Sequence, residues 1–125
     1  MNKYIKYLEQ ENFYNIPFHD NIEQLSRLIV KDIPFHVSVH KIKDIKDFPK
    51  QYVESHKHDN DELNLILADD GKELVYNIEI DGEVNEVKSP SFIWIPKGKS
   101  HSANVVRGSG TFICIILQEE YKAYS

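Results

Sequence analysis

Hydrophobic residues recur at every second position along most of the chain from residue 33 onward, which is the period of a β-strand with one buried face. The first run alternates apolar with polar residues: Ile33, Phe35, Val37 and Val39 with Pro34, His36, Ser38 and His40. Seven further runs cover residues 51–58, 63–68, 74–80, 83–88, 91–95, 102–106 and 111–117. Turn residues separate them, notably Asp81-Gly82 and Gly108-Ser109-Gly110. Eight short strands with regular turns predict an all-β sandwich or barrel.

Residues 1–31 have a different pattern, which predicts two helical pieces interrupted by Pro17. Asp20 is a candidate N-cap of the second piece, and Glu23 follows three residues later, as in a capping box. The apolar residues of this piece then recur at helical spacing: Ile22, Leu25, Leu28 and Ile29. We therefore expect an N-terminal helical extension over residues 1–31 and one β domain over residues 32–125, with residues 119–125 as a loose tail or an exchanged edge.

Composition narrows the classes of function. The chain has 125 residues with 41% hydrophobic and 28% charged side chains, the balance of a globular domain. Its formal net charge is −5 and it has no basic cluster, so we expect it to bind neither nucleic acid nor an anionic membrane. A single cysteine, Cys114, forms no internal disulfide, and no targeting segment is evident; both fit a cytoplasmic protein.

Two segments carry residues with the chemistry of a metal site. In the first, His56 and His58 lie two positions apart, so on an extended strand both imidazoles point to the same side. Glu62 opens the next apolar run, where its carboxylate can fold back beside them. Two imidazole nitrogens and one carboxylate oxygen form a suitable facial set for a divalent transition metal. In the second segment, His101 follows the turn Pro96-Lys97-Gly98, and in an antiparallel barrel it could become a fourth ligand.

The two segments together resemble the paired motifs of the cupin superfamily, whose members are small conserved β-barrels. His56, His58 and Glu62 match the first cupin motif, His-x-His followed by a glutamate, and Pro96, Gly98 and His101 match the second, Pro-x-Gly followed by a histidine. The resemblance covers about residues 33–117 and implies a double-stranded β-helix, or jelly-roll, barrel. It also implies one divalent metal held by His56, His58, Glu62 and His101, with Fe, Mn, Ni, Co, Cu and Zn all acceptable to this donor set.

Other residues are candidates for the lining of the pocket. His36 and His40 share one face of a predicted strand and, together with Tyr76, are candidate general acids or bases. Candidate substrate-binding residues are Asn64, which shares the face of Glu62, Arg107 before the glycine-rich turn, and Asn104.

These features favour a metal-dependent enzyme that acts on a small polar metabolite. An isomerase, epimerase or lyase would use the metal as a Lewis acid, whereas an Fe(II)-dependent dioxygenase would use it to bind oxygen. A cupin that binds or senses a small molecule without turnover is the alternative from another class. The candidate proton-transfer groups favour the isomerase, epimerase or lyase. The resemblance also implies a homodimer.

Overall fold

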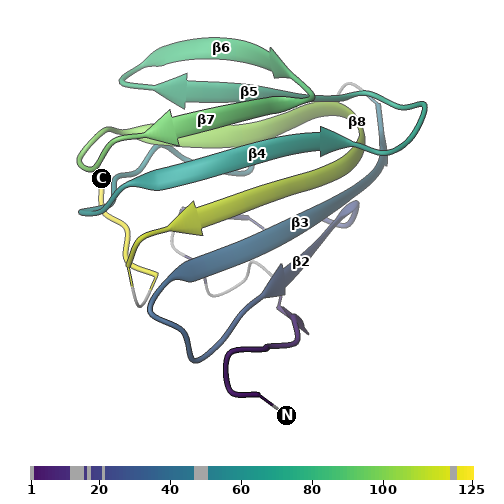
Figure 1. The fold of residues 1–125 in the computed structure, drawn as a ribbon. Helices are drawn as coiled ribbons and strands as arrows, with labels where there is room; N and C mark the ends of the chain where they lie inside the picture. Colours follow the sequence, from purple (N-terminus) through teal and green to yellow (C-terminus); the bar gives the residue numbers. More distant parts are fainter. Residues whose placement is uncertain (1, 12–15, 17, 21, 47–50, 119–120) are drawn as a thin grey trace.

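The computed structural model describes residues 2–11, 16, 18–20, 22–46, 51–118 and 121–125. Within these ranges all regular structure is β, and Figure 1 shows the strands stacked across the molecule. The strands are β1 (Glu9–Gln10), β2 (Leu25–Ile29), β3 (His36–Ile45), β4 (Glu62–Ala68), β5 (Leu74–Ile80), β6 (Glu83–Lys88), β7 (Ser91–Ile95) and β8 (His101–Ile116). The predicted all-β architecture is confirmed. No helix in the described ranges has the length and apolarity needed to cross a bilayer.

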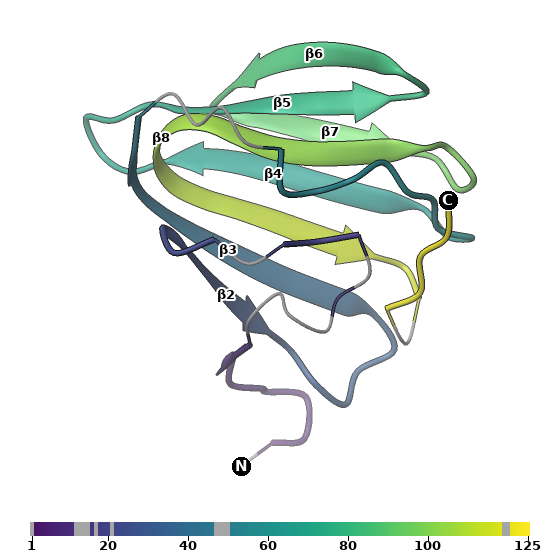
Figure 2. The same cartoon turned by 180° about the vertical axis from the view of Figure 1, so that it is seen from behind.

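The strands form two facing layers that share β8. One layer has the order β1-β2-β3-β8-β4-β7, in which the C-terminal half of β8 pairs with both β3 and β4. The N-terminal half of β8 pairs instead with β5, which in turn pairs with β6. Figure 2 shows the described residues 18–20 before β2 and the segment before β4 on the side of the molecule turned to the viewer. An isolated bridge between His19 and Val53 joins these two segments to each other, and one between His56 and His101 joins the second segment to the start of β8.

Two glycines allow β8 to pass from one layer to the other. The sequence predicted two strands here, 102–106 and 111–117, with a turn at Gly108-Ser109-Gly110, but the structure has one continuous strand. A Cβ on Gly108 would lie 1.9 Å from the carbonyl oxygen of Glu73, and a Cβ on Gly110 would lie 2.2 Å from that of Leu67. Only glycine therefore lets the neighbouring strands approach closely enough to continue the ladder through the bend.

The predicted helix over residues 20–31 is wrong where the structure describes it. Leu25–Ile29 is strand β2, which pairs antiparallel with β3, for example Arg27 opposite His40. Leu25, Arg27 and Ile29 are buried and the residues between them are more exposed, which is a period of two. The apolar residues fit both periods, and pairing with β3 decides between them because it supplies the backbone hydrogen bonds and the buried face. Pro17, the predicted break, lies outside the described residues.

Two other strand predictions differ from the structure. The run at 51–58 forms isolated bridges and no regular strand, while the run at 33–40 begins at His36 and continues to Ile45. The apolar core lies between the layers and includes Tyr52, Ile66, Tyr76, Val105 and Phe112. At one end of this core the packing changes from apolar to polar side chains, and the candidate site lies there.

Candidate metal centre

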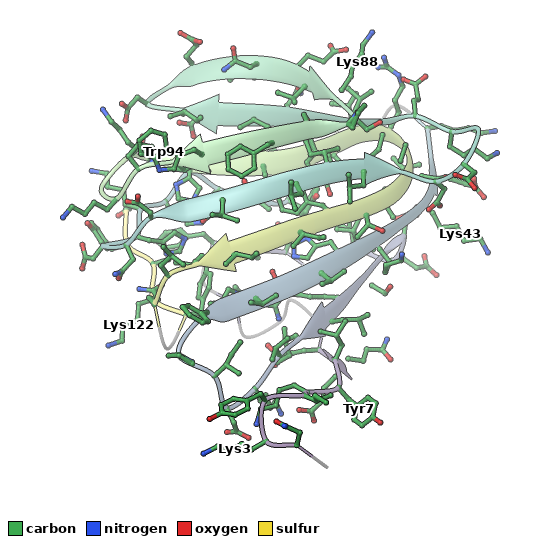
Figure 3. All side chains as sticks on the ribbon, viewed as in Figure 1. Lys3, Tyr7, Lys43, Lys88, Trp94 and Lys122 are labelled. Atoms are coloured by element: carbon green, nitrogen blue, oxygen red, sulfur yellow. The ribbon has the colours of Figure 1, made fainter. Side chains whose placement is uncertain are left out.

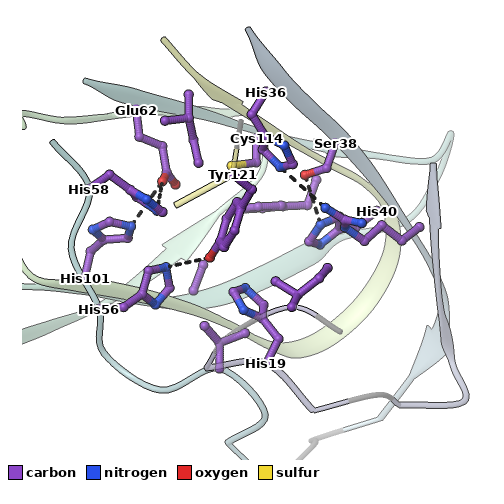
Figure 4. A pocket seen from close by; sticks show the side chains of 16 residues that line it. His19, His36, Ser38, His40, His56, His58, Glu62, His101, Cys114 and Tyr121 are labelled. Atoms are coloured by element: carbon purple, nitrogen blue, oxygen red, sulfur yellow. Dashed lines mark hydrogen bonds and ion pairs between the residues drawn. The ribbon is translucent and has the colours of Figure 1, made fainter. Parts of the chain in front are cut away.

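All six histidines of the chain line one cavity between the two layers. The lining combines His56 and His58 from the segment before β4 and His101 from the start of β8 with inward-facing residues of β2, β3, β4 and β8. Figure 4 shows the two groups on opposite sides of Tyr121, with His56, His58 and His101 beside Glu62 on one side and His36 and His40 on the other. The histidines are His19, His36, His40, His56, His58 and His101.

His56, His58 and His101 converge as the sequence predicted. One ring nitrogen from each lies within 4.8 Å of the others, and all three side chains are buried. The backbone brings them together, because His56 and His101 exchange two N–H···O bonds of 2.9 Å. The amide of Gly98 donates to the carbonyl of His58 at 2.8 Å and so ties the turn of the second segment to the first. The two motifs are therefore parts of one bridged structure.

A backbone carbonyl accepts from Nδ1 of each of these three histidines. His56 Nδ1 donates to the carbonyl of Glu54 at 2.7 Å, His101 Nδ1 donates to that of Lys99 at 3.0 Å, and His58 Nδ1 donates to that of Lys122. A carbonyl oxygen only accepts, so in the neutral ring the proton is on Nδ1 and the lone pair is on Nε2. This is the tautomer that a metal-binding histidine adopts when its second nitrogen is held by the protein.

The Nε2 atoms of His58 and His101 face the carboxylate of Glu62. The distances to Glu62 Oε1 are 3.3 Å from His58 and 3.1 Å from His101. Among the described residues, these three buried atoms have no hydrogen-bond partner. Lone pairs directed at a buried carboxylate repel one another unless a cation lies between them. The residues therefore fit a bound divalent metal, with three imidazole nitrogens and one carboxylate oxygen as donors.

The charge of Glu62 is fixed by its neighbours. Burial raises the pKa of this carboxyl, but interactions with His101, His58 and Asn64 outweigh burial and hold its pKa well below the usual range. Asn64 Nδ2 donates to Glu62 Oε2 at 2.8 Å and leaves Oε1 directed at the histidines. Burial lowers the pKa of His101, yet the Glu62 carboxylate more than reverses this, so in the metal-free chain the pKa of His101 is raised. A metal would replace the proton that this pair attracts.

The other side of the cavity is formed by the inward face of β2 and β3. His36, Ser38 and His40 point inward from alternate positions of β3, and Arg27 lies opposite His40 on β2. Ser38 Oγ lies 3.3 Å from His40 Nε2. Burial lowers the pKa of His36 to about 4 and that of His40 well below 6.5, so both rings are neutral at pH 7. The structure thus places both histidines in the cavity, as the sequence analysis expected.

The C-terminal segment closes this cavity. Tyr121 lies in its centre, with its ring 5.0 Å from that of His36 and 5.2 Å from that of His58, and its hydroxyl 3.5 Å from His56 Nε2. Tyr124 pairs with Lys57 through two backbone hydrogen bonds. The described part of the expected loose tail is therefore bound beside the cluster of His56, His58 and His101. With Tyr121 in place, the remaining cavity is about 40 Å³, which holds water but no metabolite.

Four predicted pocket residues lie elsewhere. Tyr76 is fully buried in the core and stacks on Phe112 at 4.6 Å between ring centroids, because β5 directs it between the layers. Arg107 forms ion pairs with Glu73 at 3.2 Å and Glu86 at 3.6 Å, on neighbouring elements outside the cavity.

The two asparagines support the site from behind. Asn64 holds Glu62 and does not line the cavity. Asn104 accepts from the amides of Tyr52 and Val53 at 2.9 Å and donates to the carbonyl of Val53 at 3.1 Å. It therefore fixes the segment that leads to His56, in place of the predicted contact with substrate.

Sequence reasoning missed Arg27, Tyr121 and His19 as cavity residues. Arg27 was missed because residues 20–31 were predicted to form a helix. In a strand, its position midway between Leu25 and Ile29 places it on the same inward face as these two residues. Tyr121 and His19 come from segments without a regular period, and no local signal places them in the site.

No protein-family model matches the chain, and no curated protein sequence is similar to it. Solved structures do resemble it. An RmlC-like cupin from Shewanella frigidimarina matches with a TM-score of 0.54 and 12% identity over 86% of this chain and 91% of its own. The polyketide cyclase RemF from Streptomyces resistomycificus matches with a TM-score of 0.61 and 12% identity over 100% and 82%. The DMSP lyase DddQ from Ruegeria pomeroyi matches with a TM-score of 0.57 and 12% identity over 94% and 59%.

Proposed function

We propose that this chain, which has the cupin fold, is a metal-dependent enzyme acting on a small polar metabolite as an isomerase, epimerase or lyase. The observation that carries the proposal is the convergence of His58 Nε2, His101 Nε2 and Glu62 Oε1, three buried atoms that need a cation between them. His56 completes the set. A divalent metal held there would supply Lewis-acid chemistry, and Fe, Mn, Ni, Co, Cu and Zn all suit these donors.

The residues around the metal centre support proton transfer. His36 and His40 are neutral at pH 7 and can accept a proton on the face of the cavity opposite the metal centre. Burial raises the pKa of the Tyr121 phenol well above its ordinary value, so this hydroxyl is protonated and can donate. A substrate that takes the place of the Tyr121 ring would therefore meet proton acceptors in His36 and His40.

Two observations favour this reaction class over the alternatives. The groups that face the cavity transfer protons, and two structures of the same fold are named a cyclase and a lyase. An Fe(II)-dependent dioxygenase and a binding or sensing protein without turnover are the competing proposals. They differ from the leading one in metal identity, in oxygen dependence and in the presence of turnover.

The deciding experiment is elemental mass spectrometry on protein purified without a histidine tag, followed by activity screening of small hydroxy and oxo acids with and without oxygen. We expect about one divalent ion per chain and activity that is independent of oxygen. Iron together with substrate-dependent oxygen uptake would favour the dioxygenase. A chain that holds no metal and takes up none from added divalent salts would overturn the metal proposal.

We also propose that the protein is a homodimer formed through the outer face of the first layer. This face is apolar across four strands in register, and its members are Val37, Val39, Leu63, Leu65, Leu67, Phe92, Trp94, Ile113 and Ile115. Phe92 and Trp94 are 59% and 61% exposed, so these two alone expose about 200–300 Å². Figure 3 shows Trp94 on this outer surface. Asp61 lies at the edge of this face, where its Oδ2 accepts from Trp94 Nε1 at 3.2 Å, and the strand positions between are apolar, so two copies of a chain with net charge −5 can approach through it.

Replacing Phe92 by lysine should separate the dimer. The side chain is exposed in one chain, so the fold tolerates the charge, whereas a face-to-face dimer would bury it. Light scattering after gel filtration should give twice 14.6 kDa for the wild type and 14.6 kDa for F92K. The control is Val84→Lys on β6, 62% exposed and outside the apolar face, which should remain dimeric. A wild-type mass of one chain at all concentrations would refute the dimer.

A further inference from the structure

Arg27 is the one buried cation among the described residues that line the metal-site cavity. It is 4% exposed on β2, directly opposite His40 on β3. Burial of a guanidinium is costly unless its donors are satisfied. Glu11 accepts from Nη1 at 2.9 Å, and His36 Nε2 lies 3.4 Å from Nη2. Because a guanidinium only donates, His36 accepts from Arg27 Nη2 through its Nε2. Since His36 lines the cavity, Nη2 is the guanidinium nitrogen that lies on the cavity side of Arg27.

Glu11, which forms an ion pair with Arg27, is not among the residues that line the cavity. The Glu11 side chain is 43% exposed, whereas that of Arg27 is 3% exposed. Solvent therefore screens part of the charge of Glu11. Among the described residues that line the cavity, Glu62 is the acidic side chain, and a divalent metal would more than offset its charge. The histidines on the Arg27 side are neutral, so the loaded cavity carries net positive charge that favours an anionic ligand.

The position of Arg27 defines the span of such a ligand. Arg27, His40, Phe112 and Ile66 form one cross-strand row over β2, β3, β8 and β4, and Glu62 lies on β4 four residues before Ile66. At about 4.8 Å per strand, the backbones of β2 and β4 are about 14 Å apart. Both side chains reach into the intervening space, where Tyr121 lies between His36 and His58. A ligand held at both ends would occupy the volume of the Tyr121 ring and displace it.

We infer that Arg27, with His36 beside it, is the anchor for the carboxylate of an anionic substrate whose other end reaches the metal centre. A planar carboxylate matches the planar fork of a guanidinium, and a single cation balances a single negative charge. This inference rests on the proposed function for the role of the metal end. It deepens that function by naming the substrate class, a small carboxylic acid. It also assigns the anion contact to Arg27 in place of Arg107, whose guanidinium is bound to Glu73 and Glu86.

The chain offers a direct test because it contains two arginines, Arg27 and Arg107. The side-chain Nε–H region of a nitrogen–proton NMR spectrum therefore holds two signals, of which Arg107 is the internal control. Sodium acetate is titrated into metal-free and zinc-loaded protein, with acetamide and sodium chloride as neutral and ionic controls. We expect a saturable shift of the Arg27 signal with acetate in both forms, with tighter binding in the zinc-loaded form. The Arg107 signal should not move.

Two variants sharpen the test. Arg27→Lys keeps the charge but lacks the planar fork, and it should weaken acetate binding at least about tenfold when binding is followed by histidine ring signals. Arg107→Gln should bind acetate as the wild type does. An Arg27 signal that does not move with acetate in either form, or that moves equally with acetamide, would overturn the inference. An acetate-induced shift in a protein that takes up no metal would instead sustain the anion site and refute the metal proposal.

Discussion

Replacing His58 or His101 by alanine should abolish metal binding. Each ring contributes an Nε2 lone pair directed at the same point as Glu62 Oε1, and loss of one leaves an incomplete donor set. Changes to residues that merely support a metal ligand weaken metal binding about 10–100-fold, so loss of a ligand should cost more than about 100-fold. Elemental analysis after dialysis against buffered zinc should give about one equivalent for the wild type and less than a tenth for H58A and H101A.

The matched control is His36→Ala. His36 lines the same cavity on the opposite side of Tyr121, so its loss should leave zinc content unchanged. Circular dichroism of all variants checks that the fold persists. Full zinc occupancy in both H58A and H101A would show that the ion is held elsewhere, and loss of zinc in H36A alone would move the site to the other side of the cavity.

The convergence of His56, His58 and His101 could be predicted from the sequence because it depends on local geometry. His56 and His58 are two residues apart, and a turn built on Pro96 and Gly98 sets the position of His101. These short spacings determine which way the side chains point before any long-range contact forms. The supporting contacts are different, because the carbonyl that holds His58 comes from Lys122, 64 residues later, and no local pattern reports it.

The errors have a common physical cause. Leu25, Leu28 and Ile29 suit a helix as well as a strand, and the buried Arg27 interrupts the apolar alternation that would have identified a strand. A buried cation on an inward face therefore made the local pattern misleading. Gly108 and Gly110 were read as a turn for a similar reason. Glycine permits a sharp reversal, but here it permits close contact with Glu73 and Leu67, which lie far away in sequence.

Acid should destabilise the metal-free protein steeply, starting below about pH 6.5. Burial lowers the pKa of His36 and His56 to about 4 and that of His40 well below 6.5. In the unfolded chain each histidine has a pKa of about 6.5. Between pH 6.5 and 4 the unfolded state therefore binds more protons than the native state, and stability falls as pH falls.

His101 acts in the opposite direction but above this window, because its pKa is raised and its proton is bound in both states below about pH 6.5. Below pH 6.5 the three lowered groups therefore set the slope, and the uptake on unfolding approaches three protons. The free energy of unfolding should then fall by up to about 4 kcal/mol per pH unit, a large part of the ~5–15 kcal/mol available to a domain. Glu62 contributes outside this window, since the stability from its lowered pKa is lost only below about pH 4.5.

Urea unfolding of chelator-treated protein at pH 7.5, 6.5, 6.0 and 5.5 measures this slope. The matched variant is His40→Gln, which can still bond to Ser38 but does not titrate, and it should reduce the slope by about one proton, or about 1.4 kcal/mol per pH unit. A free energy of unfolding that stays constant from pH 7.5 to 5.5, or an H40Q slope equal to that of the wild type, would mean that these rings are protonated in the folded protein. The cavity would then be wet and positively charged even without metal, and the neutral proton acceptors that the proposed reaction requires would be absent.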